Sequence, residues 1–435
     1  MEVFKQNRQF IIIIFTWLLA GLAGPLVYGV IPITMFILKR RNMYQELLLG
    51  FFFLLIMSDS RQQGLHWAES VKDIYIALLA LFIYFDRKSF SPVSRFYLQF
   101  IPFFLVSFFC LFFTPGAIFF TAFEKTLSYL FLLIVIPNYT LRCHKDHGES
   151  FYKNLIYFTA TILFAGFIIK FVHHEQAYME GRYRGLLGNP NGLGVFALLV
   201  FLTFSVIQDI YPKLFTTREK YVIDILIILS LLMANSRNSI LAVLIYLFFS
   251  YFYKISPFLG FIFFIIFIAA DQYLSSHLAD IVESLGLSHY FRVKTLEDAS
   301  GRFIAWDFAR DQIKKSIWFG KGFEYTDYLF KQNAEWLSNL GHQGNAHNSY
   351  LTFWLDTGFF GLAAYCWAFV SAFIKAAKRS KLIIPVLYSI IFSTMFESWL
   401  TASLNPFTIQ VFIILSILTS ETIVQSQAQA ALLLQ

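Results

Sequence analysis

The composition of this 435-residue chain excludes an ordinary soluble protein, because 57% of its residues are hydrophobic and only 14% are charged, whereas about a quarter are charged in soluble proteins. The net charge of +7 does not predict a nucleic-acid partner, since basic residues in a membrane protein mark the connections that stay in the cytoplasm. The three cysteines, Cys110, Cys143 and Cys366, lie in separate segments and exclude both a disulfide framework and a thiolate metal site.

Repeated apolar runs, each close to the roughly 20 residues that cross a bilayer, predict an all-α polytopic membrane protein. In chain order, the expected spans cover residues 9–22, 25–38, 46–58, 70–86, 95–113, 121–137, 151–172, 190–208, 221–235, 238–253, 256–270, 348–373, 382–397 and 405–420. The first two runs share Gly24 and Pro25 and form either two spans or one kinked or re-entrant element, so the expected total is about twelve to fourteen. The chain is thereby divided into an N-terminal transmembrane bundle (1–270), a large loop (271–347) and C-terminal transmembrane helices with a tail (348–435).

Lysine and arginine gather in alternate connections between these spans, at 39–41, 87–95, 142–145, 213–220, 254 and 375–381. Basic connections stay in the cytoplasm, so both termini are predicted to be cytoplasmic and the large loop to lie outside. Few ionisable residues fall inside a span, and Lys170, Asp224 and Glu397 fall near span ends. Because polar residues collect on the outer connections instead, we expect binding or chemistry at the outer surface.

The large loop contains one amphipathic segment, Gly301–Phe319. Helical spacing places Phe303, Trp306, Ile313 and Ile317 on one face of it. Two structures fit this pattern equally well: a helix lying in the membrane interface, or a helix packed on the loop's own core.

A glycine-rich segment at 181–192 leads directly into the 190–208 span and contains Arg182 and Arg184. Asn189 is expected to cap that helix and Pro190 to be its first residue. A helix amino terminus beside two guanidinium groups favours a phosphate or pyrophosphate. The alternative is a glycine-rich turn whose arginines touch lipid headgroups.

Two further segments place polar residues at the outer boundary. Arg237 lies in the tight corner 235–239, where it needs an anion, a carboxylate or carbonyl oxygens as a partner, unless it extends to the headgroups. His347, followed by Asn348, lies where the large loop meets the next span. Histidine titrates near neutrality and can take a proton from a hydroxyl group, although a boundary histidine taken alone more often serves structure.

No D-x-D pair or acidic cluster with metal-ligand spacing occurs on an outward connection, so no divalent cation is predicted. The charge of a departing diphosphate would then be met by outward arginines, namely Arg182, Arg184, Arg237 and Arg302. The alternative for Arg302, at the start of the amphipathic segment, is a place on the polar face of that helix.

These motifs resemble the O-antigen ligase family, which also includes O-antigen polymerases and protein O-oligosaccharyltransferases. The resemblance rests on His347-Asn348 with Gly358 and Gly361 at the family's spacing, and on Arg237 followed four residues later by Leu241. Three other features of the family recur: Arg182 with Leu186 at the same spacing, the start Ser300-Gly301-Arg302, and Trp306. The motifs cover about 181–194, 235–241 and 300–361.

The resemblance implies a GT-C-type glycosyltransferase in the bacterial inner membrane. It would move a glycan from undecaprenyl diphosphate to a lipid A–core sugar on the periplasmic side, without a metal or other cofactor and without a nucleic-acid partner. His347 would be the base or orient the acceptor. The resemblance further implies that the diphosphate is held by Arg237 and Arg302 with Arg184 or Arg182, and that Asn348, Asn189 and Tyr183 support the site.

Two other functions fit the same topology. A polymerase would use the same donor but accept a second lipid-linked unit; such enzymes tend to show paired arginine elements with a glycine eleven residues further on, which Arg182 and Arg184 lack. A flippase for lipid-linked glycans would break no bond and would need charged residues lining a central cavity, where this chain has little charge.

Overall fold

The computed structural model describes residues 8–60, 62–252, 260–270, 293–342, 344–378 and 380–420, with backbone alone for Gln63 and residues 293–301. Residues 271–292 of the expected large loop, the basic residues Lys254 and Arg379, and the expected tail after 420 lie outside the described residues. The described chain is nearly all helical, in agreement with the all-α prediction.

The α-helices up to the large loop are α2 (Arg8–Leu22), α3 (Val27–Arg40), α4 (Tyr44–Asp59), α5 (Trp67–Phe85), α6 (Ile101–Cys110), α7 (Phe119–His147), α8 (Glu149–Val172), α9 (His174–Ala177), α10 (Pro190–Ile210), α11 (Thr217–Ala234) and α12 (Arg237–Phe252), followed by a helix at Gly260–Ala270. The later helices are α14 (Val293–Lys314), α15 (Tyr325–Gln332), α16 (Ala334–Asn339), α17 (Ser349–Ala377), α18 (Ile383–Phe396) and α19 (Thr408–Thr419). Two short strands, β1 (Tyr178–Met179) and β2 (Arg182–Tyr183), pair antiparallel between α9 and α10.

A helix occupies each of the expected spans, with ends displaced by a few residues. Among the described residues, five segments are long and apolar enough to cross a membrane: Phe96–Phe113, Gly116–His147, Glu149–Val172, Pro190–Ile210 and Ser349–Ala377. The first two runs form two helices, because Gly24, at φ +83°, ends α2 and lets α3 fold back on it. A hydrogen bond of 2.8 Å from Trp17 Nε1 to Thr34 Oγ1 joins this pair.

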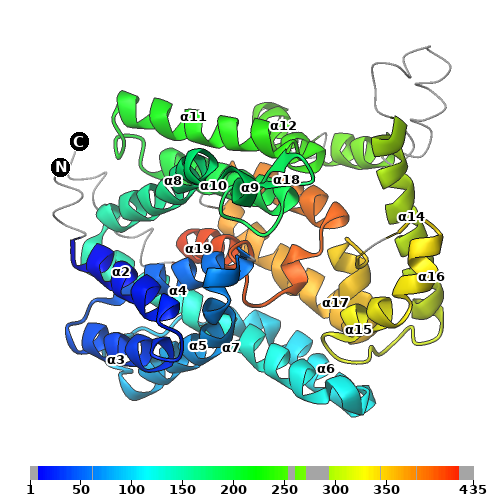
Figure 1. Cartoon of the computed structure of the whole chain (residues 1–435), viewed down its shortest axis with the longest axis horizontal. Helices are drawn as coiled ribbons and strands as arrows, with labels where there is room; N and C mark the ends of the chain where they lie inside the picture. Colours follow the sequence, from blue (N-terminus) through cyan, green and yellow to red (C-terminus); the bar gives the residue numbers. More distant parts are fainter. Residues whose placement is uncertain are drawn as a thin grey trace.

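The protein interior is built around α4, α10 and α19, whose residues are buried on almost every side (Figure 1). A helix that is apolar all round lies either in a protein interior or in lipid. Here α5, α7 and α8 pack against α4 or α10, while α7 and α17 pack against α19. By contrast, α2, α3 and α11 turn large apolar side chains outward, as helices that face lipid do.

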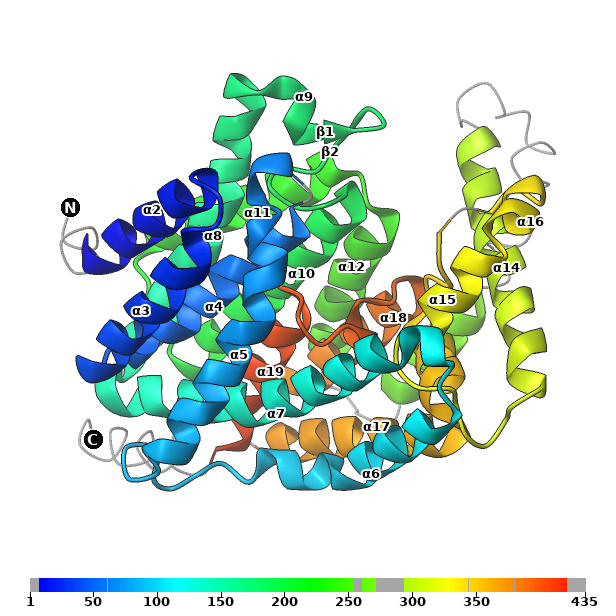
Figure 2. The same ribbon diagram turned by 60° about the horizontal axis from the view of Figure 1, so that its bottom comes forward.

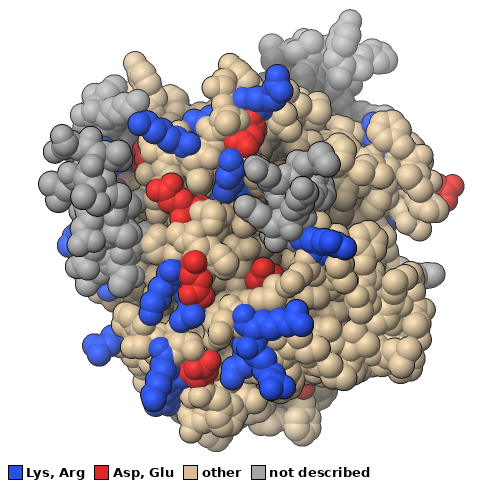
Figure 3. All heavy atoms as spheres, turned by 90° about the vertical axis from the view of Figure 1, so that its left-hand side faces the viewer, with Lys and Arg blue, Asp and Glu red and all other residues tan. Residues whose placement is uncertain are grey.

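Lysine and arginine, with some aspartate and glutamate, gather on the face of the molecule shown in Figure 3. Basic residues lie in the last turns of α3, α7 and α17, and Arg218 lies in the first turn of α11. The other ends of α11 and α17, together with α14, α15 and α16, lie on the opposite side in Figure 1. The molecule therefore has a basic end and an end that carries the loop helices.

The loop helices α14, α15 and α16 form a unit beside the bundle with a hydrophobic core of their own (Figure 2). Trp306, Ala309 and Ile313 of α14 are buried there, against Phe330 of α15 and Leu337 of α16. This packing supports the second of the two structures expected for the amphipathic segment. The expected helical face was wrong at its end, because α14 stops at Lys314 and Ile317 lies beyond it with 41% of its surface exposed.

Residues 317–322, here called the strap, cross a break in α17 at Gly358, which has φ +73°. The break frees backbone groups of the helix, and four of them, two carbonyl groups and two N–H groups, bond to backbone groups of the strap. The N–H groups of residues 359 and 360 donate to the carbonyls of 317 and 318, at 2.9 and 3.4 Å, and those of 321 and 322 donate to the carbonyls of 355 and 356, at 3.2 and 2.8 Å. A Cβ at Gly358 would lie 2.4 Å from the Trp318 carbonyl oxygen, so only glycine fits there.

Candidate functional site

His347 lies in a short turn that enters α17. Its φ of 45° is uncommon for a residue with a side chain, and such strained positions cluster at functional sites. The turn is fixed from both sides: Trp306 Nε1 donates to the Ala346 carbonyl at 3.0 Å, and the His347 N–H donates to Asn345 Oδ1 at 3.1 Å. Asn348 then caps α17 by accepting the N–H groups of residues 350 and 351. The position of the imidazole is thereby held by the backbone around it.

Glu397, just after α18, is the residue on which the site converges. Its Oε2 lies 3.6 Å from His347 Nδ1, an ion-pair distance when the imidazole is protonated. Its Oε1 accepts from Arg302 Nη2 at 3.1 Å and from Asn191 Nδ2 at 3.0 Å. The Ser349 hydroxyl donates to the Glu397 main-chain carbonyl at 2.8 Å and so fixes this residue to the start of α17.

The environment of Glu397 keeps its carboxyl ionised. Its side chain is 16% exposed. Burial acts to raise the pKa of the carboxyl, but contact with His347, the charge of Arg302 and the hydrogen bond from Asn191 outweigh burial and hold the pKa below its ordinary value. A carboxylate in this position can orient the imidazole and stabilise its protonated form.

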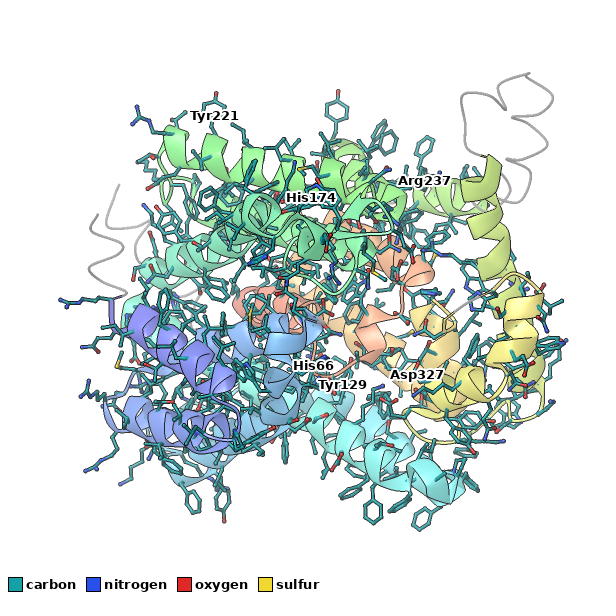
Figure 4. The ribbon with its side chains drawn as sticks, viewed as in Figure 1. His66, Tyr129, His174, Tyr221, Arg237 and Asp327 are labelled. Atoms are coloured by element: carbon teal, nitrogen blue, oxygen red, sulfur yellow. The ribbon has the colours of Figure 1, made fainter. Side chains whose placement is uncertain are left out.

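Arg182 joins the glycine-rich segment to the corner that contains Arg237. Its Nη2 donates to Asn191 Oδ1 at 2.9 Å and to the carbonyls of Ala234 and Asn235, both at 3.0 Å. Asn235, at φ +48°, ends α11, and Arg237 is the first residue of α12. Arg237 lies at the end of the bundle nearer the loop helices (Figure 4). Hydrogen bonds therefore run from Arg182 to Asn191 and from Asn191 to Glu397, and this chain ends beside His347.

The other predicted residues of the glycine-rich segment hold its shape. Arg184 donates from Nε to the Gln176 carbonyl at 3.0 Å and from Nη1 to the Gly188 carbonyl at 3.2 Å. Asn189 caps α10 by accepting the N–H of Gly192 at 2.7 Å, as expected. Tyr183 is buried, with its ring stacked on Phe167 at 5.6 Å between centroids.

A second group of charges borders the site. Lys125 of α7 pairs with Glu324 at 2.5 Å, and its charge also acts on Asp327 and Asp356. Burial raises the pKa of Asp327, whereas Lys125 overcomes burial at Glu324 and lowers the pKa of that carboxyl. Asn345 links the two groups, because its Nδ2 lies 3.5 Å from Asp327 Oδ1 while its Oδ1 accepts the His347 N–H. Asp327 is labelled in Figure 4.

The structure brings together His347 and Arg302, both of which the sequence indicated, through a carboxylate that was not expected to take part. Asn191 was also missed as a site residue. The available signal for Glu397 was an acidic side chain at the end of an apolar span, since ionisable groups at such positions are retained mainly for function.

The helices long enough to cross a membrane and the polar site at one end of the bundle define a polytopic membrane protein with a histidine–carboxylate–arginine site. Residues 222–366 match the family model described as O-antigen ligase. This match spans about one third of the chain, contains Arg237, Arg302 and His347, and supports assigning the chain to the O-antigen ligase family. At the level of the family, it indicates a membrane glycosyltransferase of the ligase or polymerase type. No curated protein matches the sequence.

Proposed function

We propose that this protein transfers a glycan from undecaprenyl diphosphate to a hydroxyl group of a lipid A–core sugar, at the periplasmic face of the bacterial inner membrane. The observation that carries the proposal is the convergence of His347 and Arg302 on the Glu397 carboxylate. This arrangement combines a proton acceptor with a cation for a leaving anion. The family match supports the reaction class.

His347 takes the proton from the acceptor hydroxyl. Its Nδ1 faces Glu397, so Nε2 is the nitrogen left for the acceptor. Gly344, at φ +106°, keeps the space beside that nitrogen open, because a Cβ there would lie 3.0 Å from Nε2. As the acceptor oxygen bonds to the anomeric carbon, the proton passes to the imidazole, and Glu397 stabilises the imidazolium that forms.

Arg302 and Arg237 receive the charge that develops when the bond from the anomeric carbon to the diphosphate oxygen breaks. The bond to Glu397 uses one of the five N–H donors of the Arg302 guanidinium, and the planar fork suits phosphate oxygens. Arg182 acts indirectly, because it donates to Asn191, which in turn donates to Glu397. Arg184 braces the backbone of the glycine-rich segment.

The basic end of the molecule supports the assignment of sides. Connections rich in lysine and arginine stay in the cytoplasm, so the end that carries Lys39, Lys145 and Lys375 is cytoplasmic. His347 precedes the start of α17 and Glu397 follows the end of α18, both on the opposite side, which is then periplasmic.

The test uses purified protein in lipid nanodiscs with a lipid diphosphate glycan, incubated with and without lipid A–core and in the presence of a chelator. A joined product that appears only with lipid A–core supports ligation. A ladder of chain lengths without lipid A–core would instead establish a polymerase. Intact donor in both incubations would contradict glycan transfer altogether.

A further inference from the structure

A polar cavity of about 200 Å³ lies beside the site and takes no part in the proposed reaction. It is formed where α4 ends and α5 begins, and Leu404 and Asn405 of the segment between α18 and α19 also line it. Its polar lining includes Asp59, His66, Glu69 and Lys72. His66, labelled in Figure 4, and Glu69 are exposed, so the cavity opens to the outside.

Three of these groups come from one face of one helix. His66 immediately precedes α5, and Glu69 and Lys72 follow at intervals of three residues, a spacing that places side chains in a row. Lys72 Nζ donates to Ser58 Oγ at 3.0 Å, which holds its ammonium group against the end of α4. The row therefore presents an imidazole, a carboxylate and an ammonium group to the same space.

Two residues that line the cavity, Asp59 and Asn405, are hydrogen-bonded to segments that carry residues of the candidate functional site. Asp59 Oδ2 accepts the N–H of Gly188 at 2.9 Å. The turn that contains Gly188 leads to Asn191, whose side chain donates to Glu397. On the other side, Asn405 lines the cavity, and its Nδ2 donates to the carbonyls of Trp399 and Ala402 in the segment that begins at Glu397. A molecule in the cavity would contact Asn405 of the segment that begins at Glu397, and Asp59, which is bonded to the glycine-rich segment.

The lining selects a neutral ligand rich in hydroxyl groups. Carboxylates accept hydrogen bonds and ammonium groups donate them, whereas a hydroxyl group does both. Among the residues that the structure describes, no three His, Cys, Asp or Glu side chains are grouped to hold a metal ion. Asp59, His66 and Glu69 of this cavity therefore do not form a metal site. The volume is below the roughly 300–1,000 Å³ of pockets that enclose drug-sized molecules, which suits a single ring.

We propose that this cavity binds one sugar residue of the donor or acceptor glycan through its hydroxyl groups. The proposal rests on the proposed glycan transfer for its choice of ligand, but the cavity and its row of groups are independent of that reaction. The bound ring would hold the glycan against the segments that carry Asn191 and Glu397.

The experiment compares the wild type with the double variant H66A/E69Q, which changes two exposed side chains and leaves the bonds of Asp59 and Lys72 in place. E335Q, an exposed glutamate of α16 outside the cavity, is the matched control. Two lipid-free probes are used in saturation-transfer NMR: the oligosaccharide released from lipid A–core and the repeat unit released from the donor diphosphate. Thermal unfolding of each variant verifies that it folds.

In the double variant, we expect loss of the saturation-transfer signal from one of the two probes and a rise of at least about tenfold in the KM of the matching substrate, with kcat unchanged. The probe that loses its signal identifies whether the sugar belongs to acceptor or donor. Unchanged signals and unchanged KM values for both would overturn the proposal while leaving glycan transfer intact. If the wild type transfers no glycan but the double variant still loses a saturation-transfer signal, the result would support sugar binding in the cavity and contradict the proposed function.

Discussion

Glu397 Oε2 lies 3.6 Å from His347 Nδ1, so the residue that follows α18 faces the imidazole that precedes α17. Both side chains are partly buried, with 16% and 32% of their surfaces exposed. A carboxylate held this close to one nitrogen fixes the direction of the other. The following predictions test this pair and the structures that hold it in place.

Replacing His347 by asparagine is expected to lower the glycan-transfer rate by at least about 100-fold, the usual contribution of a general base. Asparagine tolerates the φ of 45° at this position, so the fold should remain intact and the melting temperature unchanged. Alanine at the same position should also cost about 1 kcal/mol of stability through backbone strain. A normal transfer rate in H347N would remove the catalytic assignment of His347.

The variant E397Q tests the ionised carboxylate through pH. The pKa of Glu397 is held below its ordinary value of 4.5, so its ionised form stabilises the folded protein above about pH 4.5, and that stabilisation is lost as the pH falls through the lower folded-state value. The wild type should therefore melt above E397Q at neutral pH, and the gap should close below about pH 4.5. A gap that persists in acid would show that the carboxylate charge is irrelevant to the fold.

Arg302→Lys tests the guanidinium fork while keeping the charge. Lysine cannot bind two phosphate oxygens through a planar fork, so the KM for the lipid diphosphate donor should rise on the order of tenfold, equivalent to about 1.4 kcal/mol. The matched control is R310K on the same helix, where the arginine is 56% exposed and pairs with Asp307. Equal donor KM values in the two variants would argue against a diphosphate at Arg302.

Gly358→Ala tests the break in α17. The added Cβ would meet the Trp318 carbonyl oxygen at 2.4 Å on a backbone with φ +73°, so a loss of about 2 kcal/mol or more is expected. Gly29→Ala in α3 is the control, since a Cβ there meets nothing within 4 Å and alanine favours a helix by roughly 0.5–1 kcal/mol. Equal melting temperatures for the two variants would contradict the contact between strap and helix.

Lys125→Met tests the charges that border the site. Without the ammonium group, Glu324, Asp327 and Asp356 are left together in a largely buried space, which should cost about 2–3 kcal/mol because Glu324 is partly exposed. We expect faster proteolysis of the loop helices along with the lower stability. The exposed pair of Lys314 and Asp311 gives the control K314M, in which neither quantity should change.

The helices were predictable because hydropathy is a local property: each expected span is a helix, and Asn189 caps α10 as its neighbours indicated. The packing of the loop core was not predictable, because the contacts of Trp306 with Ala346 and Phe396 depend on how distant segments fold. The same holds for the site. Glu397 meets Asn191, Arg302 and His347 from separate segments, and no spacing along the chain records that meeting.

The strap has a consequence for which changes in length the protein can accept. Its four bonds to α17 are made by backbone groups at fixed intervals, so the residues of 317–322 other than Gly320 and Gly322, where a Cβ would clash, can be exchanged more freely than residues can be added or removed. One inserted residue would shift two of the four bonds out of register and release the loop helices, together with the turn that presents the imidazole. A family of variants that differ in loop length should therefore keep this stretch constant and place its insertions elsewhere.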